Sequence, residues 1–200
     1  MPELVELFEA ERGRLRAVAY RLLGSVEAAE DAVQETWLRL ARVDPGGVDN
    51  LGAWLRTVIT RICLDVLLAR QRRVVSAFLA AARAGDLAGI LAVLAPDVVR
   101  RADPVALPPG AAVVVRGARQ VAEGTAALAD RSRLAELALV DGRVGAVVAP
   151  HGRLRFAVAF RVRGDLITEY EVIADPARLA RLDLALLDRG GSRGGGTAGR

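Results

Sequence analysis

The stretch AAEDAVQETWLRL, residues 28–40, has the pattern of a helix with two unlike faces. Apolar side chains recur on one face at spacings of three and four residues, as on a helix that packs against a core. Gly24 and Ser25 precede the stretch and are typical of a helix stop and an N-cap. The pattern predicts a helix that begins after Ser25 and buries one stripe of side chains: Ala29, Val33, Trp37 and Leu40.

The opposite face of this helix gathers acidic and amide groups around one leucine. On a wheel of about 100° per residue, five side chains lie within roughly a quarter-turn of Leu38: Glu27, Asp31, Gln34, Glu35 and Arg42. An apolar anchor inside a polar rim is typical of a surface that binds another protein. The alternative is a solvated face with one stray leucine, since single exposed leucines are common.

Two more helices are predicted on either side, and the three form a small helical module. Leu4–Leu23 repeats apolar residues at helical spacing, and residues 43–50, VDPGGVDN, have the composition of a loop. Asn50 can cap a third helix that runs from Leu51 to about Arg70. The core stripe expected on this third helix is Trp54, Leu55, Val58, Ile62 and Val66.

Charge is distributed unevenly along this module. All 28 basic residues of the chain are arginine, and the net charge of the whole chain is +4. Residues 1–50 hold 6 arginines against 10 acidic residues, whereas residues 51–73 hold 5 arginines against one aspartate. An acidic segment followed by a basic helix indicates two surfaces with different partners.

The composition argues against several classes of protein. No apolar run reaches the roughly 18 residues that a membrane span needs. The N-terminus, MPELVELFEAERG, is charged from its third residue, unlike a signal peptide, so we expect a cytoplasmic protein. With one cysteine and one histidine, no Cys/His metal cluster can form, and neither a metal nor a cofactor is expected. Cys63 is expected to be a small buried thiol.

Beyond residue 94 the hydrophobic period changes from helical to alternating. Turn residues such as Asp141-Gly142 and Gly164-Asp165 separate the alternating runs, as in hairpins. Helices leading into a curved antiparallel sheet predict an α+β domain with a pocket between helices and sheet. Strands are predicted at 98–102, 112–116, 133–140, 144–149, 154–163 and 166–173, and helices at 74–84, 118–129 and 176–187.

Two motifs of the first module are familiar: DAVQETWL at residues 31–38 and AWLRTVITRICLD at residues 53–65. With this separation they resemble region two of the extracytoplasmic-function group of sigma-70 factors, over about residues 5–73. Those factors are the bacterial subunits that bring RNA polymerase to promoters. The resemblance implies a three-helix fold and a DNA-binding protein that acts in transcription initiation.

The second part of the chain resembles a different family. VVSAFLAAARAGDLAGILAVLAPDVV, from residue 74, and ITEYEVIADPARLARLDLALLD, from residue 167, are similar to the opening and end of a SnoaL-like domain with the cone-shaped NTF2-type fold. One sigma group carries such a domain as a C-terminal extension. The expected domains are a region-two-like module at 1–73, a SnoaL-like domain at 74–188 and a flexible Gly/Arg tail at 189–200.

The resemblance also implies roles for single residues. The second helix would dock on the clamp helices of the β′ subunit of core RNA polymerase through Asp31, Gln34, Glu35 and Leu38. The third helix and the loop at 43–50 would contact the minus-ten element of promoter DNA, with a flipped base held by the loop. The residues expected to contact this DNA are Asn50, Arg56, Arg61, Arg70, Arg72 and Arg73. For Arg70–Arg73 the alternative is a solubilising helix end, where cations also favour the helix dipole.

The chain departs from the sigma pattern in three places. Region four, a helix-turn-helix module that reads the minus-thirty-five element, normally separates the two parts, but Arg73 is followed directly by the SnoaL-like opening. Leu68 stands where the group usually has arginine. Residues 103–110, DPVALPPG, replace a glycine-rich loop of the group, so the resemblance does not carry over any regulatory contact or pocket built on that loop.

Catalysis by the second domain is not expected. Some relatives with the cone fold use an Asp or His base, and the candidates here are Asp97, Asp103, His151 and Tyr170. Asp97 and His151 occupy ordinary turn positions, and the sequence shows neither the cleft nor the shifted pKa that a general base needs. The main hypothesis is therefore a sigma-like transcription protein modulated by its C-terminal domain. Two alternatives stay open: an NTF2-like protein that binds or converts a small-molecule ligand and carries a vestigial sigma module, and an internally deleted factor that sequesters polymerase.

Overall fold

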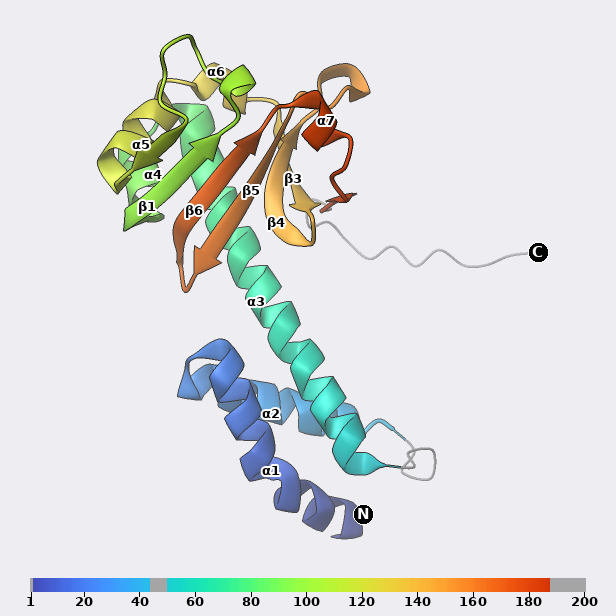
Figure 1. Cartoon of the computed structure of the whole chain (residues 1–200). Coiled ribbons are helices and arrows are strands. Elements are labelled where there is room, and N and C mark those ends of the chain that lie inside the picture. Colours follow the sequence, from blue (N-terminus) through green and yellow to red (C-terminus); the bar gives the residue numbers. More distant parts are fainter. Residues whose placement is uncertain (1, 44–49, 188–200) are drawn as a thin grey trace, which may run out of the picture. The chain divides into compact units, whose positions relative to one another are not determined.

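The computed structural model describes residues 2–43 and 50–187, and the chain divides into two compact units, Met1–Ala69 and Arg70–Arg200. Figure 1 shows the helices of the first unit and the sheet of the second. The boundary between the two predicted domains falls between residues 73 and 74, and the boundary between the two compact units falls between residues 69 and 70. Both positions lie within one helix, Leu51–Ala84. Residues 44–49 of the predicted loop at 43–50, and the whole predicted tail at 189–200, lie outside the described residues.

The N-terminal unit consists of α1 (Pro2–Leu23), α2 (Val26–Leu40) and the first part of α3 (Leu51–Ala84). Gly24 makes the turn between α1 and α2 with φ +72°, a left-handed conformation that glycine adopts without steric cost. The Ser25 hydroxyl oxygen accepts the Ala28 N–H at 3.3 Å, and Oδ1 of Asn50 accepts the Ala53 N–H at 2.9 Å. Both predicted helix caps are therefore confirmed.

The core of this unit joins the inner faces of the three helices. The stripe predicted on α2 is confirmed: Ala29, Val33 and Leu40 are buried, and Trp37 packs on the core with its ring 5.1 Å from that of Phe8. Cys63 is fully buried, as expected, and this burial raises the pKa of its thiol. The other buried members are Leu15, Ala19, Leu23, Ala32, Leu55, Ile59 and Ile62.

One residue of the predicted α3 stripe was wrong. Val66 is 38% exposed, whereas Leu67 packs on the core. The buried positions follow four-residue steps from Ile59 through Cys63 to Leu67, so the stripe turns slowly around the helix, since four residues cover slightly more than one turn.

The end predicted for the third helix near Arg70 was also wrong, because α3 continues to Ala84. No glycine or proline occurs between Gly52 and Gly85, so nothing in the sequence interrupts the helix. Gly85, with φ +65°, ends it. Asp86 then caps α4 (Leu87–Ala92), and its Oδ1 accepts the Gly89 N–H at 3.0 Å.

The C-terminal unit is built on a seven-stranded sheet in the order β2-β1-β6-β5-β4-β3-β7. In Figure 1 the last turns of α3, with α4 and α5 (Ala118–Ala126), cover one face of this curved sheet. The strands are β1 (Leu94–Ala102), β2 (Val114–Arg116), β3 (Ala135–Val140), β4 (Arg143–Val148), β5 (Phe156–Arg163), β6 (Leu166–Ile173) and β7 (Leu184–Leu186). The predicted α+β architecture is confirmed.

The expectation of an antiparallel sheet was wrong for one pair, since β1 and β6 are parallel. The consecutive strands β3 to β6 are antiparallel neighbours, and the β3–β4 turn has the predicted form, with φ +49° at Asp141 and +72° at Gly142. No hairpin joins β1 to β6, which are far apart in the sequence, so turn geometry does not force them to run in opposite directions.

Two predicted helices of this unit are shorter than expected. The helix at 118–129 divides into α5 and α6 (Ala129–Ser132). The helix at 176–187 is reduced to α7 (Pro176–Leu179), after which β7 pairs with the edge of β3. A free strand edge presents unpaired backbone groups, and pairing with β7 satisfies them against the local helical preference. No helix in the described ranges is long and apolar enough to cross a membrane.

Candidate functional site

The four residues predicted to contact polymerase share the outward face of α2. Asp31 and Gln34 are exposed, Leu38 is 44% exposed, and Glu35 is half-buried. Glu35 Oε1 accepts a hydrogen bond of 3.0 Å from Nε of Arg39, one turn later. The buried stripe of α2 occupies the other side of the helix, so these four side chains form one surface, called the α2 outer face below.

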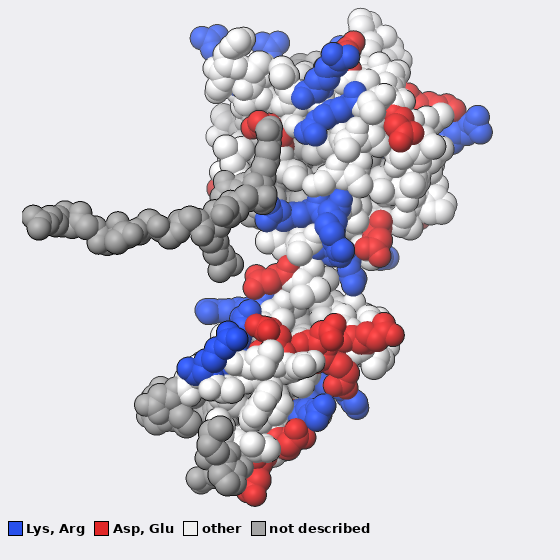
Figure 2. Space-filling model, turned by 180° about the vertical axis from the view of Figure 1, so that it is seen from behind, with Lys and Arg blue, Asp and Glu red and all other residues white. Residues whose placement is uncertain are grey.

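The acidic groups of α2 are not equivalent. Glu30 pairs with Arg16 at 3.2 Å and with Arg12 at 3.7 Å, so its charge is matched by α1. Asp31 has no ion pair within the described part of the chain, which leaves its carboxylate to solvent or a partner. Figure 2 shows acidic side chains gathered over the N-terminal unit on the face in view. Among the four residues of the α2 outer face, Glu35 is paired with Arg39 at 3.0 Å, so the unmatched negative charge near Leu38 is that of Asp31.

The residues predicted to contact DNA fall in both units. Asn50, Arg56 and Arg61 belong to the N-terminal unit and are exposed. Oδ1 of Asn50 already serves as the α3 cap, and the Arg56 guanidinium makes a long ion pair of 4.0 Å with Glu11. These three residues leave charged and amide groups at the surface near the start of α3.

Arg70, Arg72 and Arg73 belong to the C-terminal unit instead. Nε of Arg70 lies 3.8 Å from Oδ1 of Asp165 in the β5–β6 turn, and the Arg70 side chain is 24% exposed. Arg73 is exposed and Arg72 is half-buried. Arg70 therefore has an ion-pair partner within the C-terminal unit. The five arginines that were predicted to contact DNA are divided between the two units.

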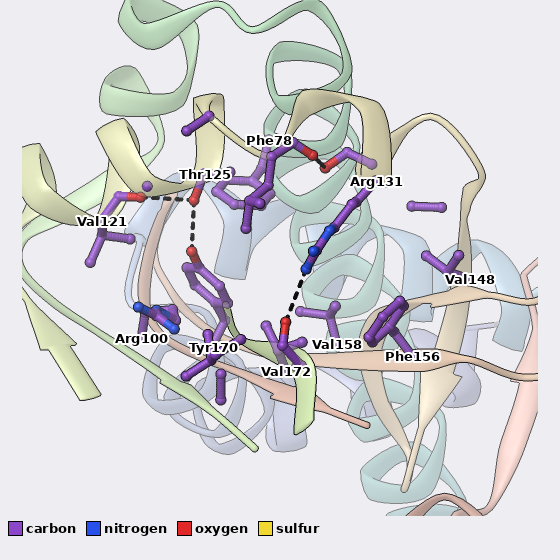
Figure 3. Close-up of a pocket in the computed structure, with 18 of the residues that line it drawn as sticks. Phe78, Arg100, Val121, Thr125, Arg131, Val148, Phe156, Val158, Tyr170 and Val172 are labelled. Atoms are coloured by element: carbon purple, nitrogen blue, oxygen red, sulfur yellow. Dashed lines mark hydrogen bonds between the residues drawn. The ribbon is translucent and has the colours of Figure 1, made fainter. Parts of the chain in front are cut away.

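The C-terminal unit also contains a cavity of about 330 Å³ on the helix-covered face of the sheet. Alternation along the strands builds its wall, since every second residue of a strand points to the same face. Its lining includes Arg100 and Ala102 from β1, Tyr170 and Val172 from β6, and Phe156, Val158 and Phe160 from β5 (Figure 3). Phe78 of α3 packs edge-on against Phe160, with ring centres 5.2 Å apart.

A short hydrogen-bond chain lies in this wall. The Thr125 hydroxyl is 2.8 Å from the Val121 carbonyl oxygen and 2.8 Å from the Tyr170 hydroxyl. Because Thr125 has one proton and donates it to the carbonyl, Tyr170 donates to Thr125. Burial raises the pKa of Tyr170, and it outweighs the opposing effects of the Thr125 hydrogen bond and the Arg100 charge.

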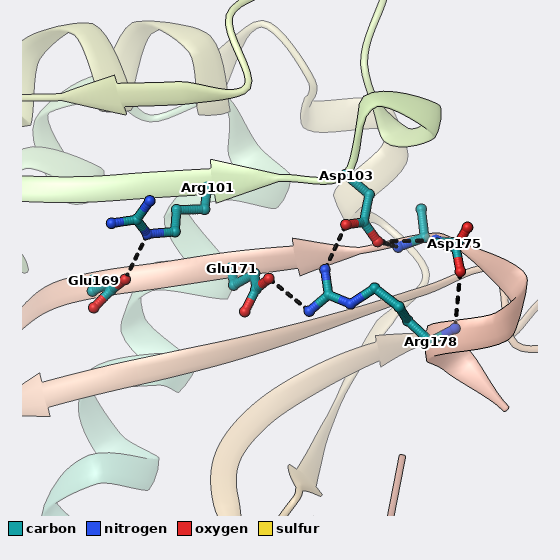
Figure 4. Close-up of polar contacts among 7 residues, drawn as sticks. Arg101, Asp103, Glu169, Glu171, Asp175 and Arg178 are labelled. Carbon is teal, nitrogen blue, oxygen red and sulfur yellow. Dashed lines mark hydrogen bonds and ion pairs between the residues drawn. The ribbon is translucent and has the colours of Figure 1, made fainter. Parts of the chain in front are cut away.

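The outer face of the sheet carries a network of ion pairs instead (Figure 4). Oδ2 of Asp103 accepts the N–H groups of Ala174 at 2.9 Å and Asp175 at 3.0 Å, and Oδ1 accepts from Arg178. Arg178 also donates to Glu171 at 2.7 Å. Burial alone would raise the pKa of Asp103, but these hydrogen bonds and the Arg178 charge lower it.

The four side chains considered for catalysis are not brought together. Only Tyr170 lines the cavity; Asp103 is engaged in the outer network, and Asp97 and His151 are exposed. His151 has φ +54° in the turn between β4 and β5. Within the described residues no group of three or more His, Cys, Asp or Glu could hold a metal ion.

Sequence reasoning missed Arg100, Thr125 and Arg131 as cavity residues. Arg100 could have been noticed, because it lies between Val98 and Ala102 on the buried side of an alternating strand, where an apolar residue is the rule. Thr125 and Arg131 belong to short helices whose position over the sheet has no local signal in the sequence.

Comparison with known proteins bears on the N-terminal unit most strongly. Residues 7–73 match the family model of sigma-70 region 2. The ECF RNA polymerase sigma factor SigJ of Mycobacterium tuberculosis is 49% identical over 69 residues, which are 34% of this chain and 22% of that protein. SigG of the same species is 43% identical over 67 residues, 32% of this chain and 18% of that protein. Residues 7–73 therefore form a region 2 of the extracytoplasmic-function sigma-70 type, as the resemblance predicted.

The matches to these two curated relatives span only about a fifth of each relative's length. Among solved structures, that of M. tuberculosis SigJ is similar over 88% of this chain and 98% of that chain, at 24% identity and a TM-score of 0.46. An NTF2-like protein of Burkholderia xenovorans is similar over 57% of this chain and 95% of that chain, at 23% identity and a TM-score of 0.39. The C-terminal unit is described by its own strand order and by the helices that cover one face of its sheet, as in the predicted α+β architecture.

Proposed function

We propose that this protein binds core RNA polymerase through the α2 outer face and acts as a sigma-like transcription protein. The observation that carries the proposal is that the exposed Asp31, Gln34 and Leu38 and the half-buried Glu35 share one face of a region 2 helix. An exposed leucine in an acidic rim suits a basic, helical partner, and the clamp helices of the polymerase β′ subunit are the partner that the family resemblance implies.

Retention by immobilised core polymerase tests this proposal. The wild-type chain is expected to be retained, whereas the double variant Asp31→Ala/Leu38→Ala is expected to pass through unbound. The matched control is Glu6→Ala/Leu7→Ala on α1, which removes one acidic residue and one exposed leucine from another face. Failure of the wild type to bind, or equal retention of the α2 variant and the wild type, would reject the proposal.

Contact with the minus-ten element is the second part of the proposal. Arg56 and Arg61 lie exposed near the start of α3, and the Asn50 side chain lies at its cap. Arginine at such positions pairs with DNA phosphates, and removing one such arginine reduces the salt dependence of binding by about one unit of slope. Arg56→Gln and Arg61→Gln should each lower the slope for the polymerase complex on promoter DNA, whereas Arg14→Gln on α1 should not.

One observation favours a variant of this function in which the protein occupies polymerase without initiating well. Helix α3 leads from the region 2 core into the SnoaL-like unit without interruption, at the place where region four is expected. Such a protein would compete with complete sigma factors for core polymerase and repress their transcription. Transcription in vitro with and without a complete sigma factor distinguishes the two outcomes, since an initiator produces transcripts alone and a competitor only reduces those of the other factor.

A further inference from the structure

The cavity of the C-terminal unit has a composition that selects the charge of its ligand. Its wall is mainly aliphatic and aromatic, and none of its lining residues is acidic. The only charged side chains in this lining are Arg100 on β1 and Arg131 on α6. From this arrangement we propose that the cavity binds an amphipathic carboxylate, with its apolar body in the cavity and its head group on one of these two arginines, which lie on different sides of the cavity (Figure 3).

The hydrogen bonds of the two arginines support this ligand class. Arg100 donates to the Ala112 carbonyl oxygen at 3.1 Å, and Arg131 donates to the Ala106 carbonyl oxygen at 3.0 Å. Neither forms an ion pair with any carboxylate in the described ranges. A guanidinium carries five N–H donors in a fork that matches a carboxylate, so each arginine keeps donors for a ligand.

On the outer face of the same sheet, unlike in the cavity, arginines pair with carboxylates of the chain itself. Arg101, next to Arg100 but on the other side of β1, pairs with Glu169 at 3.0 Å, and Arg178 pairs with Asp103 and Glu171. On the outer face, arginine therefore meets carboxylates supplied by the chain. On the cavity face, none of the residues that line the cavity supplies a carboxylate to the half-buried Arg100 or the exposed Arg131.

A shallower hollow next to the cavity extends the positive field. It shares Arg131 and Phe156 with the cavity and adds Arg155. Its single acidic residue, Asp130, pairs with Arg133 at 3.2 Å. The cavity neighbourhood is therefore positive, and an anionic ligand is attracted to it.

The aromatic residues of the wall, which include the Tyr170 neighbour of Arg100 on β6, explain why the rest of the ligand is apolar. Phe78, Phe160 and Tyr170 pack together with ring centres 5.2 to 5.5 Å apart. The hydroxyl groups of Tyr170 and Thr125 already donate within the wall, so they have no proton left for a ligand. A cavity of about 330 Å³ with such a wall suits a medium-chain or aromatic acid.

The residues of this site all belong to the C-terminal unit, so ligand binding can be tested separately from polymerase binding. The test is calorimetric titration of the full chain with decanoate, decanol and decylammonium, which share one apolar body and differ in head-group charge. Decanoate should bind at least about tenfold more tightly than decanol, as expected for a charge-assisted head-group interaction. Decylammonium should bind more weakly than decanol.

Variants then assign the residues that hold the head group. At least one of Arg100→Gln and Arg131→Gln should weaken decanoate binding about tenfold and change decanol binding little, because the decanol head group carries no charge for an arginine to pair with. Arg119→Gln, on the exposed side of α5, is the control for overall charge and should bind decanoate like the wild type. If Arg100 and Arg131 serve only to hold the backbone of residues 106–112 through their hydrogen bonds to the Ala112 and Ala106 carbonyl oxygens, the wild type will not prefer decanoate over decanol. That result, or no binding of any probe, would overturn the proposal.

Discussion

Arg178 of α7 donates a hydrogen bond from one guanidinium nitrogen to Oδ1 of Asp103, which lies 75 residues earlier in the chain. The other carboxylate oxygen accepts the backbone N–H groups of Ala174 and Asp175, at the end of β6. One side chain at the end of β1 therefore holds the start of α7 in place. Asp175 completes the arrangement by capping α7 through the Arg178 N–H at 2.9 Å.

The first prediction concerns this anchor. Asp103→Asn should loosen residues 174–178, because it removes a charged acceptor of three hydrogen bonds, each worth about 1.5–3 kcal/mol when one partner is charged. Amide hydrogen exchange by mass spectrometry should show faster exchange in this segment. Asp97→Asn, an exposed aspartate near the start of β1, is the control. Unchanged exchange at 174–178 in the Asp103 variant would show that the network does not hold α7.

The same anchor predicts a dependence on acidity. Since the folded-state pKa of Asp103 lies below its ordinary value of 3.8, the carboxylate stabilises the fold fully above pH 3.8. This contribution disappears as the pH falls through the lower folded-state value. Urea titrations below pH 4 should show a steeper loss of stability in the wild type than in Asp103→Asn. Parallel loss in the two proteins would contradict the assignment.

Tyr170 gives a prediction at the opposite end of the pH scale. Burial raises the pKa of Tyr170 above the ordinary value of 10.0, so the folded state keeps the proton that the unfolded state releases. Stability from this group is present below pH 10 and is lost as the pH rises through the folded-state pKa. Subtracting the absorbance titration of Tyr170→Phe from that of the wild type should leave a single transition above pH 10. A transition at or below pH 10 would contradict the burial of this phenol.

Variants of Asn50 can distinguish the role of its side chain as a helix cap from its proposed contact with DNA. Asn50→Ala removes the cap and should cost about 1 kcal/mol of stability, whereas Asn50→Asp keeps an oxygen acceptor for the Ala53 N–H. If the Asn50 side chain contacts DNA, both variants should weaken promoter binding by the polymerase complex. Wild-type DNA binding by Asn50→Asp, with normal thermal stability, would restrict Asn50 to its role as a cap.

Local rules were enough to predict the region 2 module. The buried stripe of α2, the caps at Ser25 and Asn50 and the burial of Cys63 follow from spacing and side-chain chemistry within one helix. The α2 outer face followed from the same wheel, because the face opposite a buried stripe is exposed. The prediction that Val66 is buried was wrong. Four-residue steps from Ile59 through Cys63 bring Leu67, rather than Val66, to the core side of the helix.

Features set by distant parts of the chain could not be predicted in the same way. The strand at Leu184–Leu186 exists because the edge of β3 is available to it, although its sequence fits a helix. The parallel pairing of β1 with β6 also depends on the whole sheet. The cavity joins Arg100 to Arg131 across two elements, and no spacing along the sequence relates their positions.

The most direct measurement of the central proposal is the affinity of the full chain for core RNA polymerase, compared among the wild type, Leu38→Ala and Leu7→Ala. Both leucines are about half exposed, but only Leu38 lies on the α2 outer face. Truncation of a central apolar anchor commonly costs at least about 2 kcal/mol, or roughly thirtyfold in Kd. We expect Leu38→Ala to show such a weakening and Leu7→Ala to bind like the wild type. Equal affinity of all three proteins, or no binding by the wild type, would contradict the proposed docking surface.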